Sequence, residues 1–259
     1  MSDHGRTNGG FASSNESGTG AKHARRGDVE IRVLGSFRVR VNGSEIDLPP
    51  TVQRAIGFLA VLHRPIPRNV VIETVWPESP PARGRARLRN VIWKANSIVS
   101  GLVVSRKTGV DLCREATVDY SEALAACHHA LQSDGQSIVL AHRAELLFDD
   151  LLPEWDEEWI DAERRTYSVL RVRALEREAK CFFHEGQFFE AEQACEAIIA
   201  SEPYRESARL LLAEVHVAEG NGGLAMQQLI EFRDLLRRDL GIAPNGEIQR
   251  LISSLVAAV

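Results

Sequence analysis

The C-terminal half of the chain contains a segment that recurs after 34 residues. HEGQFFEA (184–191) aligns with VAEGNGGLA (217–225), which places Gly186 against Gly220. This spacing is that of tetratricopeptide repeats, in which helix pairs stack through small residues and bury each other's apolar faces. The repeat therefore predicts a stack of antiparallel helices.

Helical patterns also precede the repeat. Apolar residues recur at helical spacing in 124–131 and 142–147, and a Ser-Asp-Gly turn (133–135) separates them. The stretch LLPEWDEEWIDAERR (151–165) opens a long helix that is expected to run to about His184. Since two repeats are too few for a free-standing stack, we expect these helices to complete its core. Residues 116–259 are thus predicted to form an all-α, tetratricopeptide-like domain.

The N-terminal third begins differently. Residues 1–28 have little apolar content and are expected to be a disordered tail. Between Val29 and Val41 apolar and polar side chains alternate, and Asn42-Gly43 is a strong hairpin signal. A small antiparallel sheet is therefore expected at the start of the first folded domain.

Three helical patterns follow, in 52–62, 71–76 and 88–99, and Thr51 is a plausible N-cap of the first. Two short apolar runs at 102–112 then flank the basic tip Arg106-Lys107-Thr108-Gly109. Three helices followed by a β-hairpin is the order of a winged helix, whose third helix enters the major groove. The predicted fold is mainly α: a winged helix-turn-helix domain (29–115, α+β) and then the helical domain.

Charge divides the chain at the same place. The formal net charge is −5, but residues 29–115 carry +7 and residues 116–259 carry −13. From Ser79 to Val110 there are seven Lys/Arg and no Asp/Glu. A merely solvated surface usually interleaves both signs, so this run favours contact with a polyanion such as DNA or RNA.

The third helix of the predicted winged helix has two distinct faces. Its apolar residues are spaced four, three and four apart: Leu88, Ile92, Ala95 and Val99. Another face carries Arg85, Arg89, Trp93 and Asn96, with Asn90 and Lys94 beside it. The first face is expected to dock the helix on the domain, and the second to meet phosphates.

Other chemistry finds little support in the residues. His128-His129 could ligate a metal, but neighbouring helical residues point about 100° apart. The acidic residues between Asp149 and Glu158 are typical of a solvated helix start. No catalytic arrangement, metal motif or phosphate loop is present, so we expect neither an enzyme nor a cofactor. Four widely spaced cysteines indicate reduced thiols in a cytoplasmic protein without a membrane span.

The two halves together resemble the SARP family, the antibiotic regulatory proteins of actinobacteria and their relatives. In the first half the resemblance rests on VEIRVLGSFRVRVNGSEIDLP, QRAIGFLAVL, ETVWPE and ARGRARLRNVIWKANS. In the second half it rests on LLPEWDEEWIDAERR, GQFFEAEQACEAIIASEPYRESARLLL and LLRRDLGIAP. The resemblance covers about residues 29–250 and implies an OmpR-like winged helix followed by a bacterial transcriptional activation domain.

This resemblance implies a transcriptional regulator, usually an activator, that binds direct repeats in promoter DNA as a side-by-side dimer and contacts RNA polymerase. It implies recognition-helix contacts at Arg83, Arg85, Arg87, Arg89, Asn90 and Lys94. It implies wing contacts at Arg106 and Lys107 and a phosphate contact at Arg54. Among the first set, Arg89, Asn90 and Lys94 are the candidates for base edges. Many members carry a Leu-Arg pair where this chain has Lys94-Ala95-Asn96, a departure that bears on base specificity.

Two other functions remain open from the residues alone. The helical domain could serve as a protein-interaction scaffold, with the basic domain binding another acidic partner. It could also sense a small effector in a concave surface. The larger family members add an ATPase module; this chain shows none, so no nucleotide is implied.

Overall fold

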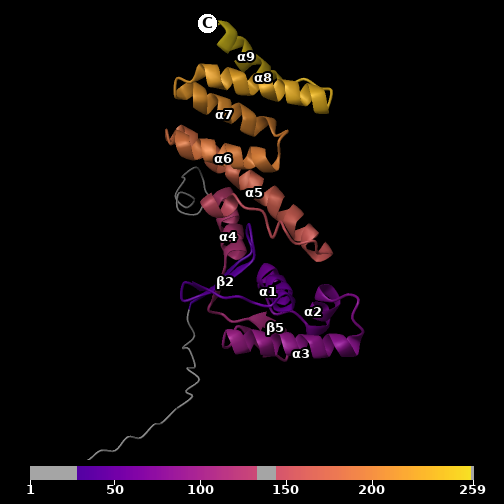
Figure 1. Ribbon diagram of the computed structural model, residues 1–259. Helices are drawn as coiled ribbons and strands as arrows, with labels where there is room; N and C mark the ends of the chain where they lie inside the picture. The colour runs from indigo at the N-terminus through magenta and orange to yellow at the C-terminus, as the bar shows by residue number, and fades with distance from the viewer. Residues whose placement is uncertain (1–27, 133–143, 258–259) are drawn as a thin grey trace, which may run out of the picture.

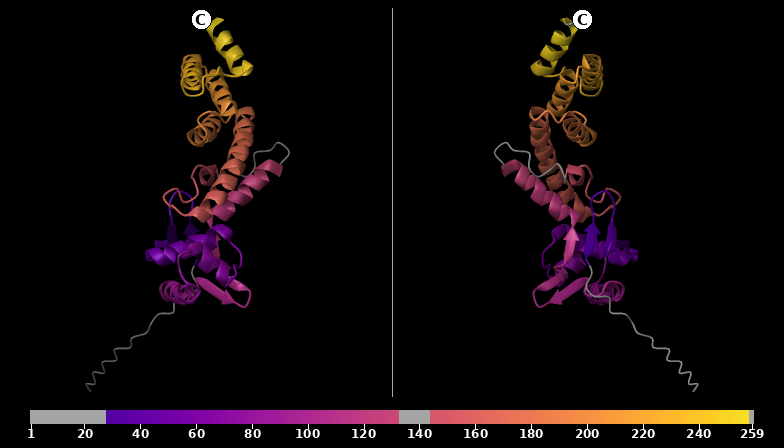
Figure 2. Two further views of the ribbon diagram at one scale, coloured as in Figure 1. Left: turned by 90° about the vertical axis from the view of Figure 1, so that its right-hand side faces the viewer. Right: turned by 90° about the vertical axis from the view of Figure 1, so that its left-hand side faces the viewer.

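The computed structural model describes residues 28–132 and 144–257 (Figure 1). The predicted disordered tail, the 133–135 turn and the start of the 142–147 pattern lie outside these residues. The molecule is elongated, with α3 near one end and α9 at the other, and the two side views show the same arrangement (Figure 2). The fold is mainly α, as predicted, with a small sheet in the winged-helix part.

The sheet has the strand order β3-β2-β1-β6. Strands β1 (Val29–Arg32), β2 (Arg38–Val41) and β3 (Ser44–Glu45) are antiparallel, and the predicted Asn42-Gly43 turn links the last two with positive φ at both residues. The fourth strand, β6 (Ala116–Val118), pairs in parallel with β1. The expectation of a purely antiparallel sheet was therefore wrong, because a strand from beyond the wing returns to its edge.

The winged helix consists of α1 (Pro50–Leu62), α2 (Arg68–Val75), α3 (Pro81–Ile98) and a hairpin of β4 (Val103–Arg106) and β5 (Gly109–Leu112). Thr51 is not the N-cap of α1, contrary to the prediction. That position belongs to Pro49, without a side-chain hydrogen bond, and a proline at the start of a helix lacks only a donor that would be unpaired there.

The helical part comprises α4 (Asp119–Gln132), a short 3₁₀ helix (Ala144–Leu147), α5 (Glu158–His184), α6 (Phe188–Ser201), α7 (Glu206–Ala218), α8 (Gly222–Asp239) and α9 (Gly246–Ala257). The pairs α5/α6 and α7/α8 are the two predicted repeats. Gly186 (φ 74°) and Gly220 (φ 82°) end the first helix of each pair in the left-handed conformation that favours glycine. The long helix begins at Glu158 rather than at residue 151.

Residues 150–157 instead join the two halves of the molecule. The Leu152 amide donates to the Val33 carbonyl, and the Gly35 amide donates to the Asp150 carbonyl, both at 2.8 Å. Trp155 packs against Phe37 and lies so close to Gly57 that a Cβ there would be 2.6 Å from the indole ring. One continuous hydrophobic core runs from the sheet into α7, so the winged helix is held rigidly on the helical stack.

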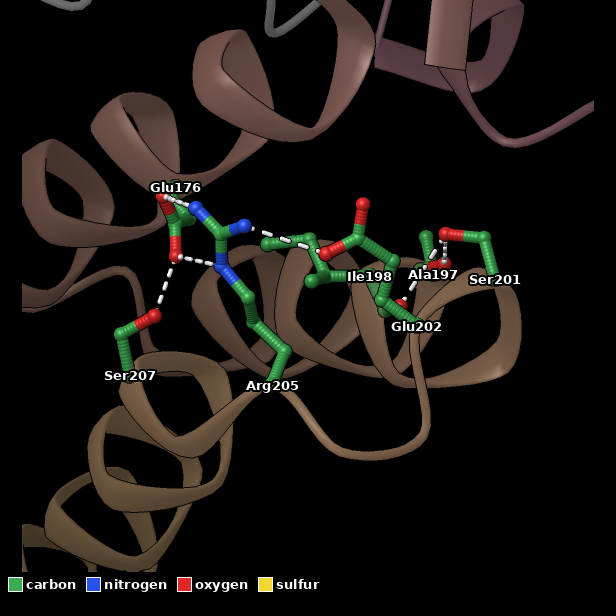
Figure 3. A network of polar contacts seen from close by, with 7 residues as sticks. All are labelled: Glu176, Ala197, Ile198, Ser201, Glu202, Arg205 and Ser207. Carbon is green, nitrogen blue, oxygen red and sulfur yellow. Dashed lines mark hydrogen bonds and ion pairs between the residues drawn. The ribbon is translucent and has the colours of Figure 1, made fainter. Parts of the chain in front are cut away.

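Arg205 ties the loop between α6 and α7 to α5 (Figure 3). Its Nε and Nη2 atoms donate to the two oxygens of Glu176 at 2.8 Å each, and Nη1 donates to Glu202 at 3.1 Å. The Ser207 hydroxyl donates to the same Glu176 carboxylate. Burial raises the pKa of Glu176, but the hydrogen bonds from Arg205 and Ser207 outweigh it and hold the pKa below its ordinary value.

We expect Glu176→Gln to lower the free energy of unfolding by about 1–3 kcal/mol at pH 7, because it removes a bidentate, charge-assisted pair. Since the pKa of Glu176 is lowered on folding, this stabilisation is present at neutral pH and is lost as the pH falls below 4.5. Urea unfolding across pH 3–7 measures both effects. Glu196→Gln, an exposed carboxylate on α6, is the control; equal acid sensitivity of wild type and Glu176→Gln would contradict the expectation.

Candidate nucleic-acid interface

Helix α3 docks on the winged helix along a narrow stripe. The buried residues are Gly84, Leu88, Val91 and Ala95. The predicted stripe included Ile92, which is only half-buried; Val91 takes its place because α3 packs between α1 and α2. A Cβ at Gly84 would lie 2.2 Å from a methyl of Ile72, so the glycine allows α2 and α3 to approach closely.

The remaining circumference of α3 carries exposed cations. Arg83, Arg85, Arg89, Asn90 and Lys94 are all exposed. In the part of the chain that the structure describes, none of them forms an ion pair with a carboxylate. The acidic helical part therefore leaves this basic surface open.

Arg87 is exposed as well but is partly engaged within the domain. Its Nη1 atom donates to the Ser79 hydroxyl at 2.9 Å, and its guanidinium lies 5.9 Å from the ring of Trp76. Trp76 itself is buried beside α2, as expected for a core tryptophan. These contacts hold the Arg87 side chain toward the segment that leads into α3.

The wing presents two further predicted cations, Arg106 and Lys107, both exposed at the tip of the β4–β5 hairpin. Asn96 fixes this hairpin to α3: its amide donates to the Val103 carbonyl, and its oxygen accepts from the Val103 amide, each at 2.9 Å. Asn96 thus positions the wing rather than extending the exposed face on which the helical pattern placed it.

The wing is also anchored through β5, next to its tip, by paired backbone hydrogen bonds between Ile66 and Val110. Gly109 lies against this bridge, where a Cβ would be 2.3 Å from the Ile66 carbonyl oxygen. The hairpin therefore stands in a defined position beside the C-terminal half of α3, and its basic tip and the cations of α3 belong to one rigid unit.

Arg54 is used differently from the other predicted contacts. Its Nη2 atom lies 2.6 Å from the Glu157 carboxylate, which is 16% exposed, at the start of α5. This ion pair joins α1 to the helical part, so the structure does not bring Arg54 together with the open cations of α3 and the wing. Sequence reasoning missed the pairing because 103 residues separate the partners.

Two grooves flank α3. The larger, of about 750 Å³, lies between α2, α3 and β4 and is lined in part by Arg68, Arg85 and Arg89. The smaller, of about 480 Å³, is lined in part by Thr51, Asn90 and Lys94. Trp93 lines both grooves and is 71% exposed. The sequence placed this tryptophan on the cationic face of the helix, and the structure adds that most of its side chain is exposed to solvent.

The described residues show no other constellation that would carry chemistry. They contain no cluster of three or more His, Cys, Asp or Glu that could hold a metal. The cysteines of the described residues form no disulfide, and burial raises the pKa of Cys127 to about 11 and that of Cys195 to about 12. None of the helices in 28–132 and 144–257 combines the length and apolarity that crossing a bilayer requires.

A family model of the bacterial transcriptional activator domain matches residues 114–256. The chain is 25% identical over 253 residues to the regulatory protein AfsR of Streptomyces coelicolor, covering 92% of this chain and 25% of AfsR. It is 24% identical over 254 residues to the transcriptional regulatory protein MoaR1 of Mycobacterium tuberculosis, covering 89% and 80%. The chain thus spans about a quarter of AfsR but most of MoaR1.

Among solved structures, the fold is similar to that of Mycobacterium tuberculosis EmbR in complex with a low-affinity phosphopeptide. The TM-score is 0.62 at 19% sequence identity, and the match covers 90% of this chain and 66% of that one. The similarity extends over both the winged-helix and the helical part, which shows that the two occur together in one known architecture.

Proposed function

The chain belongs to the bacterial transcriptional activator domain family as a SARP-type transcriptional regulator, and we propose that it binds specific promoter sequences through α3 and the wing. The observation that carries the proposal is the open face of α3, with five exposed cations that no carboxylate of the described residues neutralises. Such a surface attracts a polyanion and releases its counterions on binding.

The residues divide into two roles. Arg83, Arg85, Arg87, Arg106 and Lys107 are proposed to contact phosphates, which sets the register of the protein on the duplex. Arg89, Asn90 and Lys94 are proposed to reach base edges in the major groove, where arginine and lysine pair with guanine and asparagine with adenine. Arg54 is left out of the interface because of its ion pair with Glu157.

The remaining features of the proposal follow from family membership. We propose that the protein binds direct repeats as a dimer, that its helical part contacts RNA polymerase or another protein partner, and that it is a cytoplasmic activator without enzymatic activity. The continuous core between the halves supports this arrangement, because a partner bound to α5–α7 would be held at a defined distance from the DNA.

We expect Arg89→Ala and Lys94→Ala each to weaken binding to the upstream region of the protein's own gene by roughly tenfold, since a good base contact contributes about 1–3 kcal/mol. Electrophoretic mobility shift against a shuffled duplex of equal composition measures this. Arg237→Ala, an exposed arginine on α8, is the matched control. A scaffold that does not bind specific DNA would show no preference for either duplex, and full affinity in both variants would remove α3 from the interface.

A further inference from the structure

Trp93 has no role in the interface described so far, although its environment is unusual. Its side chain is 71% exposed, whereas Trp76 is buried and Trp155 and Trp159 are half-buried against Phe37 and Phe58. A large indole in water contributes little to folding, and tryptophan is enriched where a surface is covered by a partner. The position of Trp93 on α3 indicates what covers it.

Trp93 forms the ridge between the two grooves that flank α3. The larger groove, on the side of α2 and the wing, brings Arg85 and Arg89 to one side of the indole. The smaller groove, on the side of α1, brings Asn90 and Lys94 to the other side. The indole therefore stands along the middle of the exposed face, with cationic side chains on both sides.

This arrangement matches a helix lying in the major groove. The groove is about 12 Å wide and admits one α-helix, so the phosphate backbones pass on both sides of the helix and the base edges face its middle. Side chains that reach outward from α3, such as Arg85, then meet phosphates, while the middle ridge, formed by Trp93 with Arg89, Asn90 and Lys94 beside it, meets base edges. An indole presents mainly apolar surface, and the C5-methyl of thymine is the apolar group on a major-groove base edge.

We propose that Trp93 is a specificity-determining residue that recognises a thymine by packing its indole against the C5-methyl group. The inference rests on the proposed DNA-binding function and adds to it an apolar contact that no charged residue of α3 can supply. The inference assigns Trp93 to a contact with DNA rather than with a second copy of the chain. The cations on both sides of the indole attract the negatively charged duplex and would repel an identical surface.

The test is a double-mutant cycle between the indole and the methyl group. A duplex enriched by the full-length protein from a random library is resynthesised with each thymine in turn replaced by uracil, which removes only the methyl. At one position the wild type is expected to bind the uracil duplex about fourfold more weakly, the effect of burying one methyl group. Trp93→Ala is expected to bind the thymine duplex at least ~10-fold more weakly and to lose the distinction at that position.

Two matched variants separate this contact from a general loss of affinity. Arg89→Ala is expected to weaken binding while keeping the fourfold preference for thymine, and Arg237→Ala is expected to behave as wild type. The inference is overturned if Trp93→Ala keeps the thymine preference, or if wild type is indifferent to uracil at every position. It is also overturned if Trp93→Ala converts a dimer to a monomer in sedimentation without changing the thymine preference.

The same experiment distinguishes failure of the thymine contact from failure of the proposed DNA-binding function. If the library yields no enriched sequence, sequence-specific DNA binding itself is refuted, and the role of Trp93 with it. If a sequence is enriched and the cycle is additive, DNA binding stands and only the thymine contact is refuted.

Discussion

Replacing Arg85 and Arg89 together by glutamate is expected to raise the dissociation constant for promoter DNA by ~1,000-fold or more at physiological salt. Each substitution removes one attraction to the duplex and adds one repulsion. The affinity of a protein for its specific site exceeds its affinity for non-specific DNA by a factor of this order or more. Both side chains are exposed and have no ion-pair partner among the described residues, so the fold is expected to be unaffected. Thermal unfolding followed by circular dichroism checks that point.

Salt dependence gives this prediction a second readout. Log affinity falls linearly with log salt, with a slope of about −0.9 per phosphate neutralised. The double variant is therefore expected to show a slope shallower by about 1 than wild type, because Arg85 is the assigned phosphate contact and Arg89 the assigned base contact. The control is the double variant Arg165→Glu and Arg237→Glu, which makes the same change in net charge at two exposed arginines of the helical part. Parallel salt lines for wild type and the α3 variant would contradict the phosphate contact assigned to Arg85.

Asp119→Ala is expected to lower the free energy of unfolding by about 3–5 kcal/mol. The Asp119 carboxylate accepts hydrogen bonds from the backbone amides of Val33 at 2.9 Å, Leu34 at 3.1 Å and Tyr120 at 2.7 Å. Alanine leaves these donors without the acceptor, and each buried unsatisfied donor costs about 1–3 kcal/mol. Because domains are stable by only about 5–15 kcal/mol, the loss is a large fraction of the total.

Urea unfolding with two comparison variants tests this explanation. Glu122→Ala removes a carboxylate from the first turn of the same helix that forms no hydrogen bond or ion pair with the described residues, and is expected to cost less than about 1 kcal/mol. Asp119→Asn keeps one acceptor oxygen and is expected to fall between the two. Equal losses for Asp119→Ala and Glu122→Ala would show that the helix dipole, rather than the junction with β1, accounts for the role of Asp119.

Local patterns in the sequence were sufficient to predict most elements of this fold. The two repeat glycines, Gly186 and Gly220, predicted the helix pairs, since the turns require the left-handed conformation that glycine adopts freely. Alternation predicted β1 and β2, and Asn42-Gly43 predicted the turn from β2 to β3. The absence of acids in 79–110 predicted the basic surface, which the structure leaves open. Each of these features depends on residues that lie close together in the sequence.

The sequence alone determined that the protein has a basic winged helix and a helical repeat, because hydrophobic periodicity, turn residues and local charge all act over short distances. Only the tertiary structure decided how the two are joined: the parallel pairing of β6 with β1, the hydrogen bonds of Asp119 to Val33 and Leu34, and the ion pair of Arg54 with Glu157. Each of these contacts links residues 85 or more positions apart. Such pairings form because packing of the whole chain brings the partners together, which no local pattern encodes.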